Sequence, residues 1–82
     1  MNIRYDSDID AIYFDLIDIP SYDSDEINEG IIIDYDKEDK IVGIEIIDFK
    51  KKVEKGLTVD DLPFSDSDKL TASQYFSYSM AV

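Results

Sequence analysis

The sequence predicts an α+β fold: a four-stranded antiparallel β-sheet, arranged as a meander, followed by a short helix and a C-terminal segment. Isoleucine-rich segments in which apolar and polar residues alternate indicate strands, and the short polar segments between them indicate turns. The pattern changes after Asp48, where lysines become frequent. We therefore divide the chain into a sheet domain with a short helix, residues 1–56, and a C-terminal extension, residues 57–82, that packs on the sheet or on a partner.

The first two strands are predicted on either side of an Asp-rich turn. Ile3–Tyr5 is the first strand and Ala11–Leu16 is the second. Asp6–Asp10 lies between them, and its Asp and Ser side chains favour a turn because they hydrogen-bond to their own backbone. The polar segment Pro20–Asn28 is predicted as a loop. Alternation in the second strand places Ile12, Phe14 and Leu16 on one face and Tyr13 and Asp15 on the other.

The third and fourth strands are predicted as a hairpin. Glu29–Tyr35 and Ile41–Ile47 are rich in isoleucine, and Asp36–Lys40 joins them. Two β-branched segments joined by a short polar loop are typical of a β-hairpin. One face is expected to carry Ile31, Ile33, Tyr35, Val42, Ile44 and Ile46, and the other Ile32, Asp34, Gly43 and Glu45.

Two short helical segments are predicted after the sheet. Phe49–Gly56 has Asp48 before it as an N-cap and Gly56 as its C-cap. A further turn begins after Thr58, which would act as its N-cap, and Pro63 stops it.

The last part of the chain has two interpretations. Ser65–Asp68 is predicted as a loop. In Leu70–Val82 the apolar residues fall mainly at even positions and serines at odd positions, which favours a strand. The serine content and the terminal position favour a mobile tail almost as strongly.

The charge of the chain limits its partners. The 82 residues include 20 acidic and 8 basic side chains, for a net charge of −12. Such a field repels phosphates and attracts basic proteins or cations, so we expect no direct binding to DNA or RNA. The same charge could serve solubility alone.

The sequence shows no signal peptide and no apolar segment near the ~20 residues of a membrane span, so we expect a cytoplasmic protein without a membrane partner.

The chain contains no Cys and no His. Disulfides and zinc sites built from Cys or His are therefore excluded, as are the usual nucleophile–base pairs of hydrolases. The serines have no histidine to activate them. We expect a protein that is not an enzyme and that holds no cofactor.

Three motifs together indicate a family. Tyr5–Tyr13 fits the pattern Y-D-x-x-x-D-A-x-Y, Asn28–Asp36 fits x-E-G-x-x-x-D-Y-D, and Ile41–Asp48 contains V-G-I-E-I followed by an apolar residue and Asp. In order and spacing, residues 1–50 resemble the small prokaryotic domain-of-unknown-function family 2283. The resemblance implies a fold, and it implies an antitoxin-like role as a small acidic partner of a ribonuclease-type toxin. Asp39 departs from the family pattern, which usually has glycine in this hairpin loop.

A calcium site in the hairpin is a weaker alternative. Its candidate ligands have the oxygen spacing of an EF-hand loop and are Asp34, Asp36, Glu38 and Glu45. Asp39 occupies the position of the required glycine, and the flanking segments are strands instead of helices. An ordinary hairpin turn explains the same residues, so no metal site is favoured.

Partner binding is the favoured class of function. Acidic turns would attract a basic partner, and aromatic residues near the C-terminus are of the type enriched in interfaces. The candidate partner-binding residues are Asp6, Asp8, Asp10, Asp23, Asp25, Tyr75, Phe76 and Tyr78. An apolar second face of the sheet would need a cover, which could be a helix, the C-terminal segment or the second subunit of a homodimer.

The leading hypothesis is an acidic protein-binding module, and its concrete form is an antitoxin-like inhibitor of a basic RNA-cleaving protein. Two alternatives remain open: an inhibitor that mimics nucleic acid to block a defence enzyme, and a homodimeric structural protein or hairpin Ca²⁺ binder.

Overall fold

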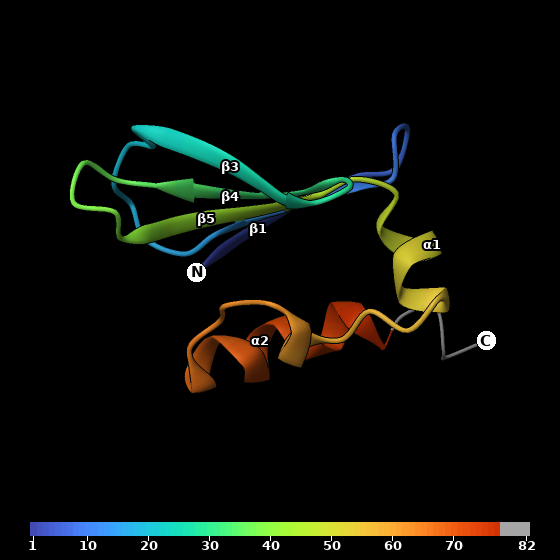
Figure 1. The fold of residues 1–82 in the computed structure, drawn as a ribbon. Helices are drawn as coiled ribbons and strands as arrows, with labels where there is room; N and C mark the ends of the chain where they lie inside the picture. The colour runs from blue at the N-terminus through green and yellow to red at the C-terminus, as the bar shows by residue number, and fades with distance from the viewer. Residues whose placement is uncertain (78–82) are drawn as a thin grey trace. The chain divides into compact units, whose positions relative to one another are not determined.

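The computed structural model (Figure 1) describes residues 1–77, and the chain divides into two compact units, residues 1–49 and the segment from Lys50 onward. The first unit is an antiparallel β-sheet and the second is helical, which confirms the α+β class. None of the helices within residues 1–77 is long and apolar enough to cross a membrane.

The sheet has five strands, not the four that the sequence predicted. Their order across the sheet is β1-β2-β5-β4-β3, and all neighbours are antiparallel. The strands are β1 (Asn2–Asp6), β2 (Ala11–Asp15), β3 (Asp23–Asn28), β4 (Ile31–Tyr35) and β5 (Ile41–Ile46). Because β5 lies between β2 and β4, the sheet is not a simple meander.

The additional strand is β3, which lies in the segment predicted as a loop, Pro20–Asn28. It consists of Asp, Ser, Glu, Ile and Asn, and all six residues are exposed. Asp, Ser and Asn are poor strand formers, and an exposed strand needs no apolar alternation. The backbone ladder with β4 determines this strand, and local sequence does not reveal it.

The turn from β3 to β4 shortens the predicted third strand at its start. Glu29 and Gly30 form the turn, with Asn28 opposite Ile31. Gly30 has a φ of 73°, in the left-handed region that glycine occupies readily. The Gly30 N–H donates a 2.8 Å hydrogen bond to the Glu26 carboxylate, which braces the turn.

The predicted assignment of alternate residues to opposite faces is confirmed in the hairpin and in β2. The side chains on one face of the sheet are at most 2% exposed at six positions: Ile12, Phe14, Ile33, Val42, Ile44 and Ile46. Burying large apolar side chains in this way contributes about 1.5–3 kcal/mol each to folding. We call the opposite side of the sheet the outer face.

The loop between β4 and β5 is organised by Asp36. One oxygen of its carboxylate accepts the backbone N–H groups of Glu38 and Lys40, at 2.8 and 2.9 Å. Asp39 has a φ of 63°, so a non-glycine residue takes the left-handed conformation at the position where glycine was expected. Asp tolerates this conformation better than most residues, because its short side chain can hydrogen-bond locally.

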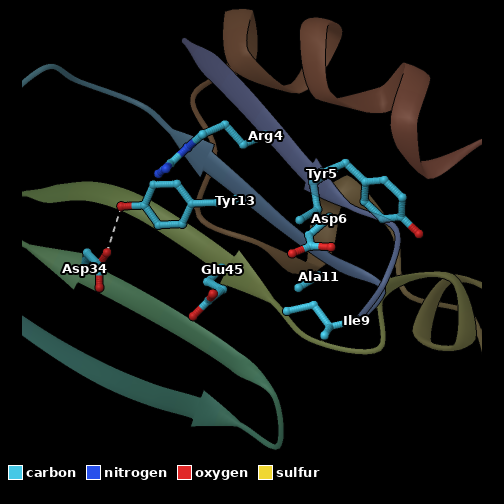
Figure 2. A pocket seen from close by; sticks show the side chains of 9 residues that line it. Arg4, Tyr5, Asp6, Ile9, Ala11, Tyr13, Asp34 and Glu45 are labelled. Carbon is cyan, nitrogen blue, oxygen red and sulfur yellow. Dashed lines mark hydrogen bonds between the residues drawn. The ribbon is translucent and has the colours of Figure 1, made fainter.

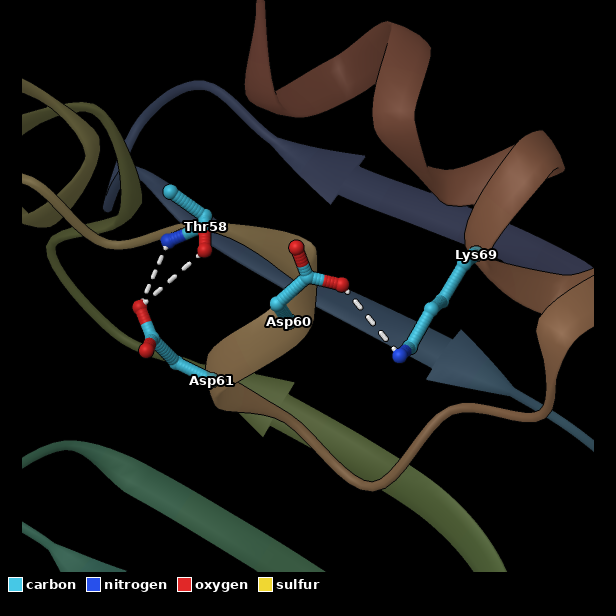
Figure 3. Close-up of polar contacts among 4 residues, drawn as sticks. All are labelled: Thr58, Asp60, Asp61 and Lys69. Atoms are coloured by element: carbon cyan, nitrogen blue, oxygen red, sulfur yellow. Dashed lines mark hydrogen bonds and ion pairs between the residues drawn. The ribbon is translucent and has the colours of Figure 1, made fainter.

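The second unit begins with two short helical segments that the sequence predicted. Helix α1 (Phe49–Glu54) precedes Gly56, whose φ is 112°. The 3₁₀ turn η1 (Val59–Asp61) follows Thr58, whose N–H donates a 2.9 Å hydrogen bond to the Asp61 carboxylate (Figure 3).

Residues Asp66–Phe76 are helical, so the predicted loop at Ser65–Asp68 is wrong, and the strand interpretation of Leu70–Val82 is wrong as far as Phe76. Helix α2 (Asp66–Phe76) has Ser65 as its N-cap, with the Ser65 Oγ accepting the Asp68 N–H at 3.2 Å. Its buried residues, Ala72 and Phe76, are four apart. Helical spacing therefore decides which residues are buried, and the alternation at even positions was coincidental.

Helix α2 contacts other parts of its own unit. The Phe76 ring packs edge-on against Phe64, with centroids 6.4 Å apart. Lys69 forms a 3.2 Å ion pair with Asp60 of η1 (Figure 3). The predictions for residues 78–82 lie outside the described residues, and the prediction that 57–82 packs on the sheet or on a partner stays a prediction.

Candidate functional site

The outer face of the sheet carries two rows of side chains that run across all five strands. The strand registers place directly opposed residues next to one another, in the order β1, β2, β5, β4, β3. The first row is Arg4, Tyr13, Glu45, Ile32 and Glu26, and the second is Asn2, Asp15, Gly43, Asp34 and Ser24.

Tyr13 connects the two rows. Its hydroxyl donates a 2.7 Å hydrogen bond to Asp34 Oδ2, although β5 lies between their strands. The phenol ring reaches Asp34 by crossing over Gly43, where a Cβ atom would overlap the Tyr13 hydroxyl. Gly43 is needed here because it leaves the space that the tyrosine occupies.

Two further contacts extend this arrangement to the edge strands. Ser24 Oγ of β3 donates a 2.6 Å hydrogen bond to Asp34 Oδ1. On the other side, the guanidinium carbon of Arg4 lies 4.8 Å from the centroid of the Tyr13 ring, a cation–π distance. The resulting outer-face network consists of Arg4, Tyr13, Asp34 and Ser24 and joins four strands over the fifth.

The network keeps Tyr13 protonated. Burial raises the pKa of the Tyr13 hydroxyl strongly, and the hydrogen bond to Asp34 and the negative charges of Asp34 and Asp15 raise it further. Arg4 opposes this rise only in part. A hydroxyl in this state is a hydrogen-bond donor, so the arrangement favours a structural role for Tyr13 over catalysis by a tyrosinate.

A shallow hollow lies beside the network, between the β1–β2 turn and the centre of the outer face (Figure 2). Its charged lining residues are Arg4, Asp6, Asp34 and Glu45. Both Asp34 oxygens accept hydrogen bonds from Tyr13 and Ser24. Asp6 Oδ1 accepts the Asp8 N–H at 3.0 Å. Most of these polar groups therefore serve the fold already.

The predicted calcium ligands are not assembled into a site. Asp34 and Glu45 lie on the outer face, whereas the Asp36 carboxylate caps loop amides and Glu38 is exposed in the loop. Within residues 1–77 no group of three or more Asp or Glu side chains is placed to hold a metal ion.

The predicted acidic residues lie at two opposite edges of the sheet. Asp6 ends edge strand β1, and Asp8 and Asp10 belong to the turn that follows it, where Asp10 Oδ1 accepts a 2.7 Å hydrogen bond from the Tyr5 hydroxyl. Asp23 and Asp25 are exposed on edge strand β3. The structure therefore presents two separate acidic surfaces.

The predicted aromatic residues differ from one another in exposure. Tyr75 is 40% exposed, while Phe76 is buried and packs against Phe64. Tyr78 lies outside the described residues.

Sequence reasoning missed the edge strand and the network. Ser24 and Glu26 were assigned to a loop, and neither carries an apolar signal that would reveal a strand. Tyr13, Asp34 and Gly43 were visible as motif positions, but nothing in the sequence pattern indicated that they meet. The long tyrosine, the glycine and the carboxylate become one unit only when the strand order brings β5 between β2 and β4.

Comparison with known proteins gives a family. A family model described as Protein of unknown function (DUF2283) matches residues 2–50, which span the whole sheet. No match was found among the curated proteins or among the solved structures.

Proposed function

The chain belongs to the DUF2283 family, whose description assigns no activity, and we propose that it is an acidic protein-binding module that captures a basic protein through edge strand β3. The observation that carries this proposal is the exposed edge: β3 ends the sheet, all six of its residues are exposed, and three of them are acidic, Asp23, Asp25 and Glu26.

Charge supports a basic partner. The chain has a net charge of −12, and no lysine or arginine occurs within β3. A negative potential of this kind accelerates the encounter with a positively charged protein and disfavours nucleic acid. Because the attraction acts between exposed charges, binding should weaken as salt rises.

Binding to an arginine-rich peptide tests the proposal. The fluorescently labelled peptide is titrated with the full chain at low and at high salt, and an acidic peptide of the same length is the control. We expect binding of the basic peptide only, with affinity that falls at high salt.

Matched variants test the place of binding. Asp23→Asn with Asp25→Asn removes two charges from β3, and Asp66→Asn with Glu54→Gln removes two exposed charges elsewhere. We expect the β3 variant to lose much more affinity than its control. Equal losses in the two variants would show that the net charge, and not β3, attracts the peptide.

The more specific form of the proposal is antitoxin-like inhibition of a basic RNA-cleaving protein. The family resemblance and the charge support it. Co-production with the basic product of an adjacent gene, followed by a cleavage assay on RNA, is the test. We expect RNA cleavage to be restored when Asp23 and Asp25 are replaced by Asn, and unimpaired cleavage in the presence of the original chain would count against this form.

A further inference from the structure

We propose that the partner adds a strand to the sheet along β3, and that Asp23 and Asp25 select basic side chains at alternate positions of that strand. This inference rests on the proposed function and specifies how the basic partner is recognised. The required partner segment is extended, with Lys or Arg at two positions separated by one residue.

The open edge supplies the backbone groups for strand addition. β3 pairs with β4 on one side only and ends the sheet on the other. An edge strand presents unpaired N–H and C=O groups to which an extended peptide can hydrogen-bond. All six residues of β3 are exposed in the described part of the chain, so the edge is accessible.

The register defines which side chains an added strand would meet. Asp23 is opposite Tyr35 and Asp25 is opposite Ile33, so both acids lie on the same face as buried Ile33. Two residues along a strand span about 6.6–6.8 Å. Basic residues on an added strand match this spacing when they alternate, because alternate side chains share one face.

Two other polar residues of β3, Ser24 and Glu26, are engaged within the sheet. Ser24 Oγ donates to Asp34, and the Glu26 carboxylate accepts the Gly30 N–H at 2.8 Å. One oxygen of Asp23 accepts the neighbouring Ser24 N–H at 2.9 Å. The Asp25 carboxylate has no hydrogen bond or ion pair with any residue in the range 1–77. The Asp25 carboxylate and the second carboxylate oxygen of Asp23 are therefore available to bind a partner.

Charge argues against a second copy of the chain as the added strand. If two β3 strands paired antiparallel in full overlap, Asp23 would face Asn28, and Asp25 of each copy would face Glu26 of the other. Like charges directly opposed across strands are destabilising. A basic strand would place positive charges opposite these acidic residues, so the same contacts become attractive. The β3 edge therefore favours a basic partner over a second copy of the chain.

The opposite edge has a different chemistry. β1 carries one basic residue, Arg4, and one acidic residue, Asp6. Arg4 is held over the Tyr13 ring. A basic strand would gain less at β1 than at β3, and we therefore assign the site to β3 alone.

Two peptides of identical composition separate this recognition from simple charge attraction. One alternates arginine with threonine, and the other has the same number of arginines at every third position, so that successive arginines fall on opposite faces of the strand. We expect the alternating peptide to bind the full chain about three- to tenfold more tightly, because two matched cross-strand charge pairs form only in that arrangement. This preference should disappear with Asp23→Asn and Asp25→Asn and persist with Asp66→Asn and Glu54→Gln.

Backbone methylation of the alternating peptide tests the hydrogen-bonded ladder. Every second peptide nitrogen is methylated, in one version at the arginines and in the other at the threonines. In an added strand only alternate N–H groups point at the edge, so we expect one version to lose binding and the other to retain it.

The outcomes distinguish the inference from the proposed function. Equal affinity for the peptides with arginine at every second and at every third position, together with equal tolerance of both methylation patterns, would overturn strand addition and leave charge-driven binding intact. Absence of binding by either peptide at low salt would overturn both. Sedimentation of the chain alone as a dimer that Asp25→Lys strengthens would also overturn the inference, because a lysine at this position would face Glu26 of a second copy paired along β3.

Discussion

The Tyr13 hydroxyl donates a hydrogen bond to Asp34 across β5, and it does so over a residue without a side chain, Gly43. Each of the three lies on a different strand. The hydrogen bond therefore depends on the pairing of β5 with both β2 and β4. Its role can be tested by substitution at each of the three positions.

Gly43→Ala should destabilise the sheet. The new Cβ would overlap the Tyr13 hydroxyl, so the tyrosine must move and give up its bond to Asp34. We expect a loss of about 1–3 kcal/mol in the free energy of unfolding, measured by urea denaturation. In a Tyr13→Ala background the same Gly43→Ala substitution should cost much less, because the overlap is gone. Equal costs in the two backgrounds would contradict the assigned role of Gly43.

Tyr13→Phe should remove the hydrogen bond and keep most of the ring. We expect a loss of about 0.5–1.5 kcal/mol in the free energy of unfolding. Ser24→Ala removes the second donor to Asp34 and is the comparison. If the two donors act through the same carboxylate, the double variant should depart from the sum of the single variants. Simple additivity would indicate that the two bonds are independent.

The raised pKa of Tyr13 predicts a loss of stability at alkaline pH. The folded state holds the Tyr13 proton more tightly than the unfolded state, where tyrosine has a pKa of about 10. The stabilisation is therefore complete below about pH 10 and decreases as pH rises above it. To isolate the contribution of this hydroxyl, the measurement is the difference in unfolding free energy between the original chain and Tyr13→Phe. That difference should shrink above about pH 10, and a constant difference would contradict the prediction.

Asp39→Gly should stabilise the β4–β5 hairpin. Asp39 has a φ of 63°, and glycine adopts this conformation without the steric cost of a Cβ. We expect a gain of about 0.5–1 kcal/mol in the free energy of unfolding. Glu38→Gly is the matched control, since Glu38 does not have a positive φ and glycine there should only add flexibility to the unfolded chain. Stabilisation by both substitutions would show that backbone conformation at Asp39 is not the cause.

Ser65→Ala should weaken helix α2. The Ser65 Oγ accepts the Asp68 N–H, which otherwise lacks a partner in the first turn. We expect the free energy of unfolding to fall by about 1 kcal/mol. The measurement is denaturation monitored by circular dichroism at 222 nm. Ser73→Ala is the control within the helix, where Ser73 Oγ bonds back to the Leu70 carbonyl and alanine should be neutral or slightly favourable. A larger loss at Ser73 than at Ser65 would contradict the capping role.

Regions with a strong local signal were predicted well. The β4–β5 hairpin, its loop and its two faces followed from the alternation of isoleucine with polar residues, and α1 followed from the lysine-rich segment before Gly56. The failures lie where local signals are weak or misleading. β3 is an acidic, fully exposed strand, and α2 buries residues at helical spacing although its apolar residues alternate.

The candidate site was less accessible to sequence reasoning. Asp23 and Asp25 were selected for their charge, but their placement on an edge strand, separate from the Asp6–Asp10 turn, depends on the strand order. The hydrogen bonds that occupy Ser24 and Glu26 depend on it too.

The sequence by itself determined the composition of the buried face, the acidic character of the chain, the position of the central hairpin and the family, because these depend on residue type and on short-range periodicity. Only the tertiary structure decided the fifth strand, the helical state of residues 66–76 and the meeting of Tyr13 with Asp34 over Gly43. These features arise from backbone pairing and packing between residues far apart in the chain, and no local pattern of side chains encodes them.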